Sequence, residues 1–179
     1  MADVKHAVYN SDNVSATTDG SLIVSMKYMG SGSTATAIDN GNIVLVGELM
    51  AGEKQIHKAT TPAANSPRAQ LAIVTTVEED KKAVLKSDTN LEKYTNEAGK
   101  TLRGFRFHTG DTFSVSAEAL DGTPKKGDAV EVQAGTKMKV VETAETATAA
   151  STQIGKIVDE TKYKRYTLYT ICLLYTSDA

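Results

Sequence analysis

A two-residue alternation of apolar and polar side chains is the feature that most constrains what this chain can fold into. In the segment 22–28, Val24, Met26 and Tyr28 fall on one side and the residues between them on the other, which is the spacing of a β-strand. The same spacing recurs over 112–119, where apolar residues alternate with Thr, Ser and Glu. Short strands of this kind, separated by turns, predict a mainly β protein that forms a small barrel or sandwich of short antiparallel strands.

Turn residues divide the rest of the chain into further short strands. Gly, Asn, Asp and Pro tolerate or impose the backbone angles that turns need. A hairpin or a corner between two sheets is expected around 108–111, between the two aromatic strands that flank it. The other strands are expected at 43–46, 70–77, 130–133, 138–140, 154–158 and 163–173, with turns at 39–42, 51–53, 61–67, 121–122 and 126–128.

One or two short helices are expected in the middle of the chain, between residues 78 and 99. A charged run opens this segment, and Ser87 to Asn90 can cap a helix. Leu91 and Tyr94 lie three residues apart, as on one helix face, and Gly99 would end the helix.

The domain organisation predicted from the pattern has three parts. Residues 1–20 are polar and show no periodicity, which predicts a flexible N-terminal arm that either docks on a partner or frays without a role. Residues 21–173 form a β-rich domain, with a possible sub-boundary near 122–127 and an exposed low-complexity loop at 142–152. The last eight residues, CLLYTSDA, resemble translated sequencing-adapter sequence of metagenomic reading frames, so 172–179 is interpreted as an artefactual tail.

The charge balance argues against a dedicated nucleic-acid binder. Lys and Arg number 20 and Asp and Glu 22, a formal charge of −2, whereas a nucleic-acid binder presents a basic face. No apolar run approaches the roughly 20 residues of a membrane span. The start of the chain lacks the apolar stretch of a signal peptide, which predicts synthesis in the cytoplasm.

No set of residues in the sequence makes a credible active site. His6, His57 and His108 lack a second His or a Cys at metal-ligand spacing, so neither a metal nor another cofactor is expected. His108 could be oriented as a base by Asp111, but a Gly turn between strands explains this pair better. Cys172 has no nucleophile signature around it. The chain is therefore predicted not to be an enzyme.

Three further motifs have structural explanations that we favour over functional ones. Gly99-Lys100-Thr101 resembles the end of a phosphate-binding loop, but Tyr94 stands where that loop needs Gly, so a helix end followed by strand entry is expected. Glu78-Glu79-Asp80 lacks Ca²⁺-loop spacing and is interpreted as the start of a helix. The interleaved cations and aromatics of 162–166 could bind single-stranded nucleic acid, but an edge strand protected by Lys and Arg is favoured.

Four segments carry a resemblance to a known group of proteins. AIDNGNIVLVGEL, NEAGKTLRGFRFHTGDTFSVSAEALDGTP, GDAVEVQAGTKMKV and IGKIVDE resemble small structural proteins encoded near the major capsid gene of tailed bacteriophages and prophages of Gram-positive gut bacteria. The resemblance covers about residues 38–171 and implies a head decoration or capsid-stabilising protein on the virion surface. It implies the major capsid protein lattice as the partner and allows a homo-oligomer, but it assigns no functional residue.

A soluble binding module is the competing class. Such a module could act at the virion tail or recognise a host-surface glycan. A glycan site would need exposed aromatic side chains beside carboxylates, and with no Trp in the chain the candidates are Tyr residues such as Tyr94 and Tyr163.

Overall fold

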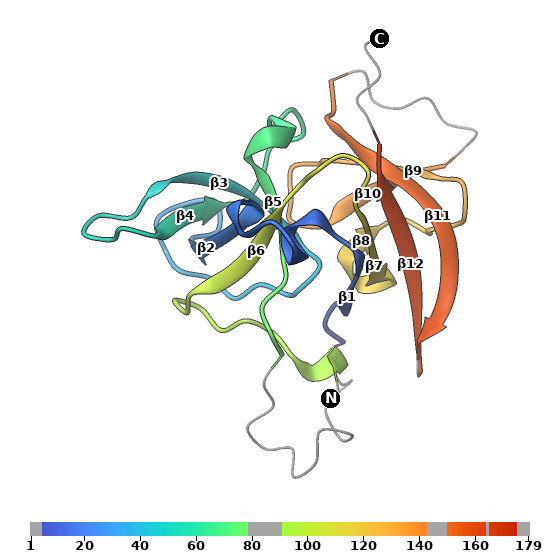
Figure 1. Cartoon of the computed structure of the whole chain (residues 1–179), viewed down its shortest axis with the longest axis horizontal. Helices are drawn as coiled ribbons and strands as arrows, with labels where there is room; N and C mark the ends of the chain where they lie inside the picture. The colour runs from blue at the N-terminus through green and yellow to red at the C-terminus, as the bar shows by residue number, and fades with distance from the viewer. Residues whose placement is uncertain (1–4, 79–90, 143–149, 164, 175–179) are drawn as a thin grey trace.

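The structure, a computed structural model, describes residues 5–78, 91–142, 150–163 and 165–174, and within them the fold is mainly β (Figure 1). Five strands close a barrel and seven form a second sheet. The barrel contains β2 (Ile23–Tyr28), β4 (Ile56–Thr60), β3 (Ile43–Leu49), β5 (Leu71–Val74) and β6 (Leu102–Arg106), in that spatial order. The sheet contains β1 (Tyr9–Asn13), β7 (Thr112–Ser116), β12 (Tyr166–Leu173), β11 (Gln153–Tyr163), β9 (Ala129–Glu131), β10 (Met138–Val141) and β8 (Leu120–Asp121), again in spatial order.

Most strand pairs are antiparallel, as predicted, but β2 with β4 and β10 with β8 are parallel. The first predicted strand is confirmed, since Val24, Met26 and Tyr28 are all buried in the barrel. Two predicted strands are shorter in the structure. β5 ends at Val74, and β7 ends at Ser116, after which the 3₁₀ turn η6 (Ala117–Ala119) follows.

The helical content within the described residues is limited to short 3₁₀ turns. Of the predicted helical segment 78–99, Leu91–Lys93 forms one such turn (η5), and residues 79–90, including the proposed cap at 87–90, lie outside the described residues. The other turns are η1 (Ser15–Thr17), η2 (Gly20–Leu22) and η3 (Arg68–Gln70). No helix in the described part of the chain is long and apolar enough to cross a membrane.

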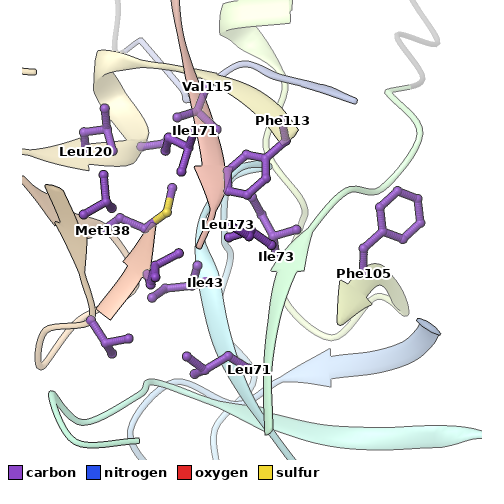
Figure 2. Close-up of a cluster of buried hydrophobic side chains, with 14 of the residues drawn as sticks. Ile43, Leu71, Ile73, Phe105, Phe113, Val115, Leu120, Met138, Ile171 and Leu173 are labelled. Atoms are coloured by element: carbon purple, nitrogen blue, oxygen red, sulfur yellow. The ribbon is translucent and has the colours of Figure 1, made fainter. Parts of the chain in front are cut away.

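The barrel and the sheet share one hydrophobic core. Ile43 and Ile73 of the barrel pack in the same buried cluster as Phe113 and Leu173 of the sheet (Figure 2). β5 explains the continuous apolar run at 71–74, because Leu71 and Ile73 belong to this shared core while Ala72 and Val74 face the barrel interior. The two parts therefore bury apolar surface against each other and fold as one unit.

The chain passes from the barrel to the sheet at a corner between β6 and β7. This is the corner expected around 108–111, since β6 lies in the barrel and β7 in the sheet. The predicted sub-boundary near 122–127 does not coincide with this change, because that segment joins β8 to β9 within the same sheet. The tight turn needs Gly110, whose φ of 91° is a left-handed conformation that other residues adopt at a cost.

The prediction of a flexible arm is wrong for the described part of residues 1–20. β1 pairs with β7 from Tyr9 opposite Val115 to Asn13 opposite Thr112. Four small apolar side chains of this segment are 1–5 % exposed: Ala7, Val8, Val14 and Ala16. Their irregular spacing has neither strand nor helix period, which is why the pattern concealed them.

The C-terminal strand uses two residues of the segment interpreted as an artefactual tail. Cys172 pairs with Thr112, and Leu173 is 1 % exposed in the shared core. Residues 175–179 lie outside the described residues. The prediction that residues 172–179 are not part of the natural protein is tested by resequencing the locus across its 3′ end.

Tyr9 gives the protein an alkaline pH dependence. Its ring packs 6.0 Å from that of Phe113, and its hydroxyl accepts a 3.1 Å hydrogen bond from Ser11. Burial raises the pKa of Tyr9 to about 12. Between pH 10 and 12 the folded protein keeps a proton that the unfolded chain loses, so the free energy of unfolding should fall by about 2–3 kcal/mol over this range.

The measurement is urea unfolding at pH 9 to 12 of the wild type and of Tyr9→Phe, which has no proton to lose. The other ionisable groups are common to both proteins, so the difference between the two curves isolates Tyr9. Parallel curves would show that Tyr9 titrates normally and would overturn the prediction.

Candidate functional site

Three polar side chains, Ser15, His108 and Asp111, meet at the corner between β6 and β7. Asp111 is 3 % exposed there, and its Oδ1 accepts hydrogen bonds from the backbone N–H of Ser15 at 3.0 Å and from the Ser15 hydroxyl at 2.5 Å. The Ser15 Oγ also lies 3.1 Å from Nδ1 of His108. Ser15 thus meets His108 and Asp111, which follow it in the chain by 93 and 96 positions.

These three side chains do not form the relay of a serine hydrolase. In such a relay the carboxylate and the hydroxyl contact opposite nitrogens of the imidazole, so that a proton can pass through the ring. Here Ser15 and Asp111 both approach Nδ1 of His108, at 3.1 and 3.7 Å, and Ser15 donates directly to Asp111. The cluster therefore anchors the N-terminal segment to the corner, which agrees with the structural explanation of the His108 and Asp111 pair.

Arg68 completes the electrostatic surroundings of this corner. Its guanidinium donates to the carbonyl of Leu174 through Nη1, and burial lowers its pKa while the charge of Asp111 acts in the opposite direction. Oδ2 of Asp111 and Nη2 of Arg68 are both buried without a hydrogen-bond partner in the described part of the structure. The two opposite charges stabilise one another across the corner.

Asp111→Ala should destabilise the protein by about 2 kcal/mol, because the N–H of Ser15 loses its acceptor and the charge of Arg68 loses its counterpart. Chemical denaturation measures this loss. Asp121→Ala is the matched control, since Asp121 is an exposed carboxylate on β8 and should change stability by less than about 0.5 kcal/mol. Equal effects at the two positions would refute the anchoring role.

A second polar network joins the segment before β3 to the loop before β6. Asn96 donates to the carbonyl of Ile38 and to Oδ1 of Asn40, each at 3.0 Å. Asn40 in turn donates to the carbonyl of Thr76 at 2.8 Å and accepts from its N–H at 3.1 Å. The Asn40 amide satisfies the backbone N–H and C=O of Thr76, and the Asn96 amide reinforces the Ile38 carbonyl, which also accepts from the backbone N–H of Asn96. The network is structural.

The three histidines lie apart from one another. His6 contacts Oδ1 of Asp39 at 2.8 Å, and His57 lies 2.8 Å from the carbonyl of Gly47. Within the described ranges no group of three or more His, Cys, Asp or Glu side chains could hold a metal ion. Cys172 is a free, half-buried thiol.

The two remaining local motifs have structural roles in the described residues. Gly99 adopts φ of 80° in a turn closed by the backbone hydrogen bond from Lys100 to Glu97, and the side chains of Lys100 and Glu97 pair at 2.6 Å. β6 follows, so the expected strand entry is confirmed, but no helix ends at Gly99. The carboxylate of Glu78 accepts a 3.3 Å hydrogen bond from the side-chain amide of Asn40, and burial raises the pKa of Glu78. Glu79 and Asp80 lie outside the described residues, so the predicted helix start remains a prediction.

A shallow hollow of about 220 Å³ lies beside the start of β12. Its charges are balanced, because the cations Lys5 and Arg165 face the carboxylates Glu92 and Glu118. Arg165 lies 3.6 Å from Glu92 and 5.3 Å above the ring of Tyr166. The hollow thus has no excess charge with which to hold an ionic substrate.

The tyrosines suggested for nucleic-acid or glycan binding differ in their exposure and in their contacts. Tyr166 is 8 % exposed and carries Arg165 on its ring, which leaves no open face for a stacked base. Tyr94 donates a 3.2 Å hydrogen bond to Asn96 of the internal network. Tyr163 is 43 % exposed near the end of β11. Of these three, Tyr163 is the most exposed.

The distal half of β11 is the most exposed segment of regular structure in the described chain. β11 pairs with β12 along its length, but its other side pairs with β9 only between Gln153 and Lys156. From Val158 to Tyr163 every residue is exposed, and β11 forms the outer border of the sheet there (Figure 1). The sequence predicted an edge strand near 162–166, but the alternation did not reveal that the free edge begins at Val158.

Comparison with protein-family models, with curated proteins and with solved structures found no match for this chain.

Proposed function

We propose that this protein is a non-catalytic structural component of a virion, a head decoration or capsid-stabilising protein that binds the assembled lattice of the major capsid protein. The observation that carries the proposal is the free edge of β11 between Val158 and Tyr163. An exposed strand edge offers backbone N–H and C=O groups to a partner strand, and alternate side chains add selectivity. The resemblance of residues 38–171 to capsid-associated proteins supplies the partner.

The use of polar side chains supports a structural role. Asp111, Asn40 and Asn96 hold chain segments together inside the fold. Glu131 is 1 % exposed and pairs with Lys139 at 2.9 Å across β9 and β10. Side chains committed to such contacts stabilise a scaffold, which is what a lattice-bound protein requires.

The alternative is a soluble binding module of the virion tail or for a host-surface glycan. Tyr163 favours it, because its side chain is 43 % exposed and shares one face of β11 with Asp159, whereas Glu160 lies on the other face. An exposed aromatic ring beside carboxylates is the combination that a sugar site uses. Both functions place the contact on β11 and differ in the partner.

Co-sedimentation with particles assembled from the major capsid protein, which the resemblance implies is encoded near this chain, tests the proposal. The wild type should sediment with particles in a saturable manner and should not bind unassembled capsid subunits. Val158→Asp should weaken particle binding about tenfold, because it puts a charge at the start of the free edge. Leu49→Asp is the matched control, since Leu49 is a similarly exposed apolar residue on the barrel, 48 % against 39 % for Val158.

Failure of the correctly folded wild type to sediment would eliminate the decoration hypothesis. Loss of binding by Leu49→Asp with normal binding by Val158→Asp would move the contact from β11 to the barrel.

A further inference from the structure

The free edge of β11 has a regularly paired portion in which opposite charges flank the central residue. A bulge interrupts the pairing of β11 with β12 between Ile157 and Asp159, and regular pairing runs from Asp159 to Tyr163. The midpoint of this portion is Thr161, with Glu160 on one side and Lys162 on the other. Within the described ranges neither Glu160 nor Lys162 forms an ion pair with another residue of the chain.

The geometry of antiparallel pairing restricts how two copies of such an edge can meet. In an antiparallel pair, two opposed residues either both direct their backbone groups at the partner or both direct them away. Two identical strands related by a two-fold axis satisfy this condition only when one residue faces its own copy. The register is then fixed by which residue lies on the axis.

Charge selects one of the three central registers. With Glu160 on the axis, two carboxylates face each other, and with Lys162 on the axis, two ammonium groups do so. With Thr161 on the axis, Thr161 faces Thr161, a favourable cross-strand pair, and Glu160 of each copy faces Lys162 of the other. The register with two opposite-charge pairs is also the one centred on the regular portion of the strand.

We infer that the β11 edge binds a second copy of this chain, forming an antiparallel two-fold pair centred on Thr161. The edge of each sheet is thereby covered, and the two sheets join into one continuous sheet across the dimer. The same residues explain how the free edge avoids other partners, because Lys162 opposes a strand that offers no carboxylate at the matching position. The inference does not depend on the proposed capsid function.

The pairing should be weak in dilute solution. Five residues of strand span roughly 17 Å, and this contact is much smaller than the roughly 1,600 Å² of a standard stable interface. Association should therefore become measurable at high protein concentration or where the copies are held close together.

Charge exchange across the axis provides the test. Analytical ultracentrifugation over a concentration series to about 1 mM should show a reversible monomer–dimer equilibrium for the wild type. In Glu160→Lys, the new Lys at position 160 of each copy faces Lys162 of the other, so both cross-axis pairs repel. In Lys162→Glu, the new Glu at position 162 faces Glu160 of the other copy, and both pairs again repel. Each single variant should associate at least tenfold more weakly.

The two single variants mixed in equal amounts should recover wild-type association, because every cross-axis pair in the heterodimer is again opposite in charge. The double variant Glu160→Lys, Lys162→Glu should recover it alone. Both positions are exposed, so the variants should keep the wild-type circular dichroism spectrum and melting temperature. A wild type that stays monomeric to 1 mM, single variants that associate normally, or a mixture that does not recover would each overturn the inference.

Discussion

Deletion of residues 1–19 is expected to unfold the protein or to leave it barely stable. The deletion removes β1 from the sheet and the buried side chains of Ala7, Val8, Val14 and Ala16 from the core. Burial of each Val contributes about 1.5–3 kcal/mol, and the lost hydrogen bonds of Ser15 leave Asp111 uncompensated. The total loss of about 5–10 kcal/mol compares with a typical stability of about 5–15 kcal/mol.

Thermal and urea unfolding measure this effect. Asn10→Ala is the control within the same segment, because Asn10 is exposed on β1 and should alter stability by less than about 0.5 kcal/mol. A truncated protein that unfolds cooperatively at the wild-type midpoint would show that the segment contributes no packing. It would then act as the docking arm that the sequence suggested.

Gly155→Ala is expected to destabilise the protein by about 3 kcal/mol or more. Gly155 lies opposite Leu173 in the antiparallel pair of β11 and β12. A Cβ at this position would overlap the backbone carbonyl of Cys172, with the carbonyl carbon only 2.9 Å away. A paired backbone cannot move aside as a flexible side chain can, so the central strands of the sheet would have to separate locally.

The control for this substitution is Gly20→Ala. No atom lies within 4 Å of the position that a Cβ on Gly20 would occupy, so the change should be close to neutral. Both variants add one methyl group, and comparison of their melting temperatures isolates the contact with Cys172. Equal melting temperatures would show that β11 and β12 do not approach each other this closely at Gly155.

The sequence predicted those elements whose burial follows a regular period. β2 alternates strictly between buried and more exposed residues, because one of its faces is buried. The hairpin of β9 and β10 was also predicted from its alternating sequence, although Glu131 and Val141 are buried as well. The packing of the barrel against the sheet through one shared core could not be predicted in this way. It depends on β5, which is buried on both faces and therefore shows a continuous apolar run without alternation.

The polar residues illustrate a second limit of sequence reasoning. The turn at 108–111 was predicted from its Gly and Asp, but the partner of Asp111 is Ser15, 96 positions earlier in the chain. The strand predicted at 130–133 would alternate and place Glu131 on the face away from Val130, yet Glu131 is 1 % exposed and paired with Lys139. Such partners are set by tertiary structure, and no local spacing encodes them.

The free edge of β11 connects the two proposals. A protein spaced regularly on a lattice is held at high local concentration, so even a weak contact between copies becomes occupied. The edge can serve one partner at a time, because a single strand side is available on each copy. Binding to the capsid through Val158 and pairing about Thr161 would therefore have to use adjoining parts of the edge or alternate between copies.

The most direct measurement of the proposed function is electron cryomicroscopy of capsid particles saturated with this protein. The account predicts additional density at symmetry-related positions on the outer surface, into which the barrel and the seven-stranded sheet fit with β11 at the contact with the capsid or with a second copy. Particles indistinguishable from those prepared without the protein would contradict the account.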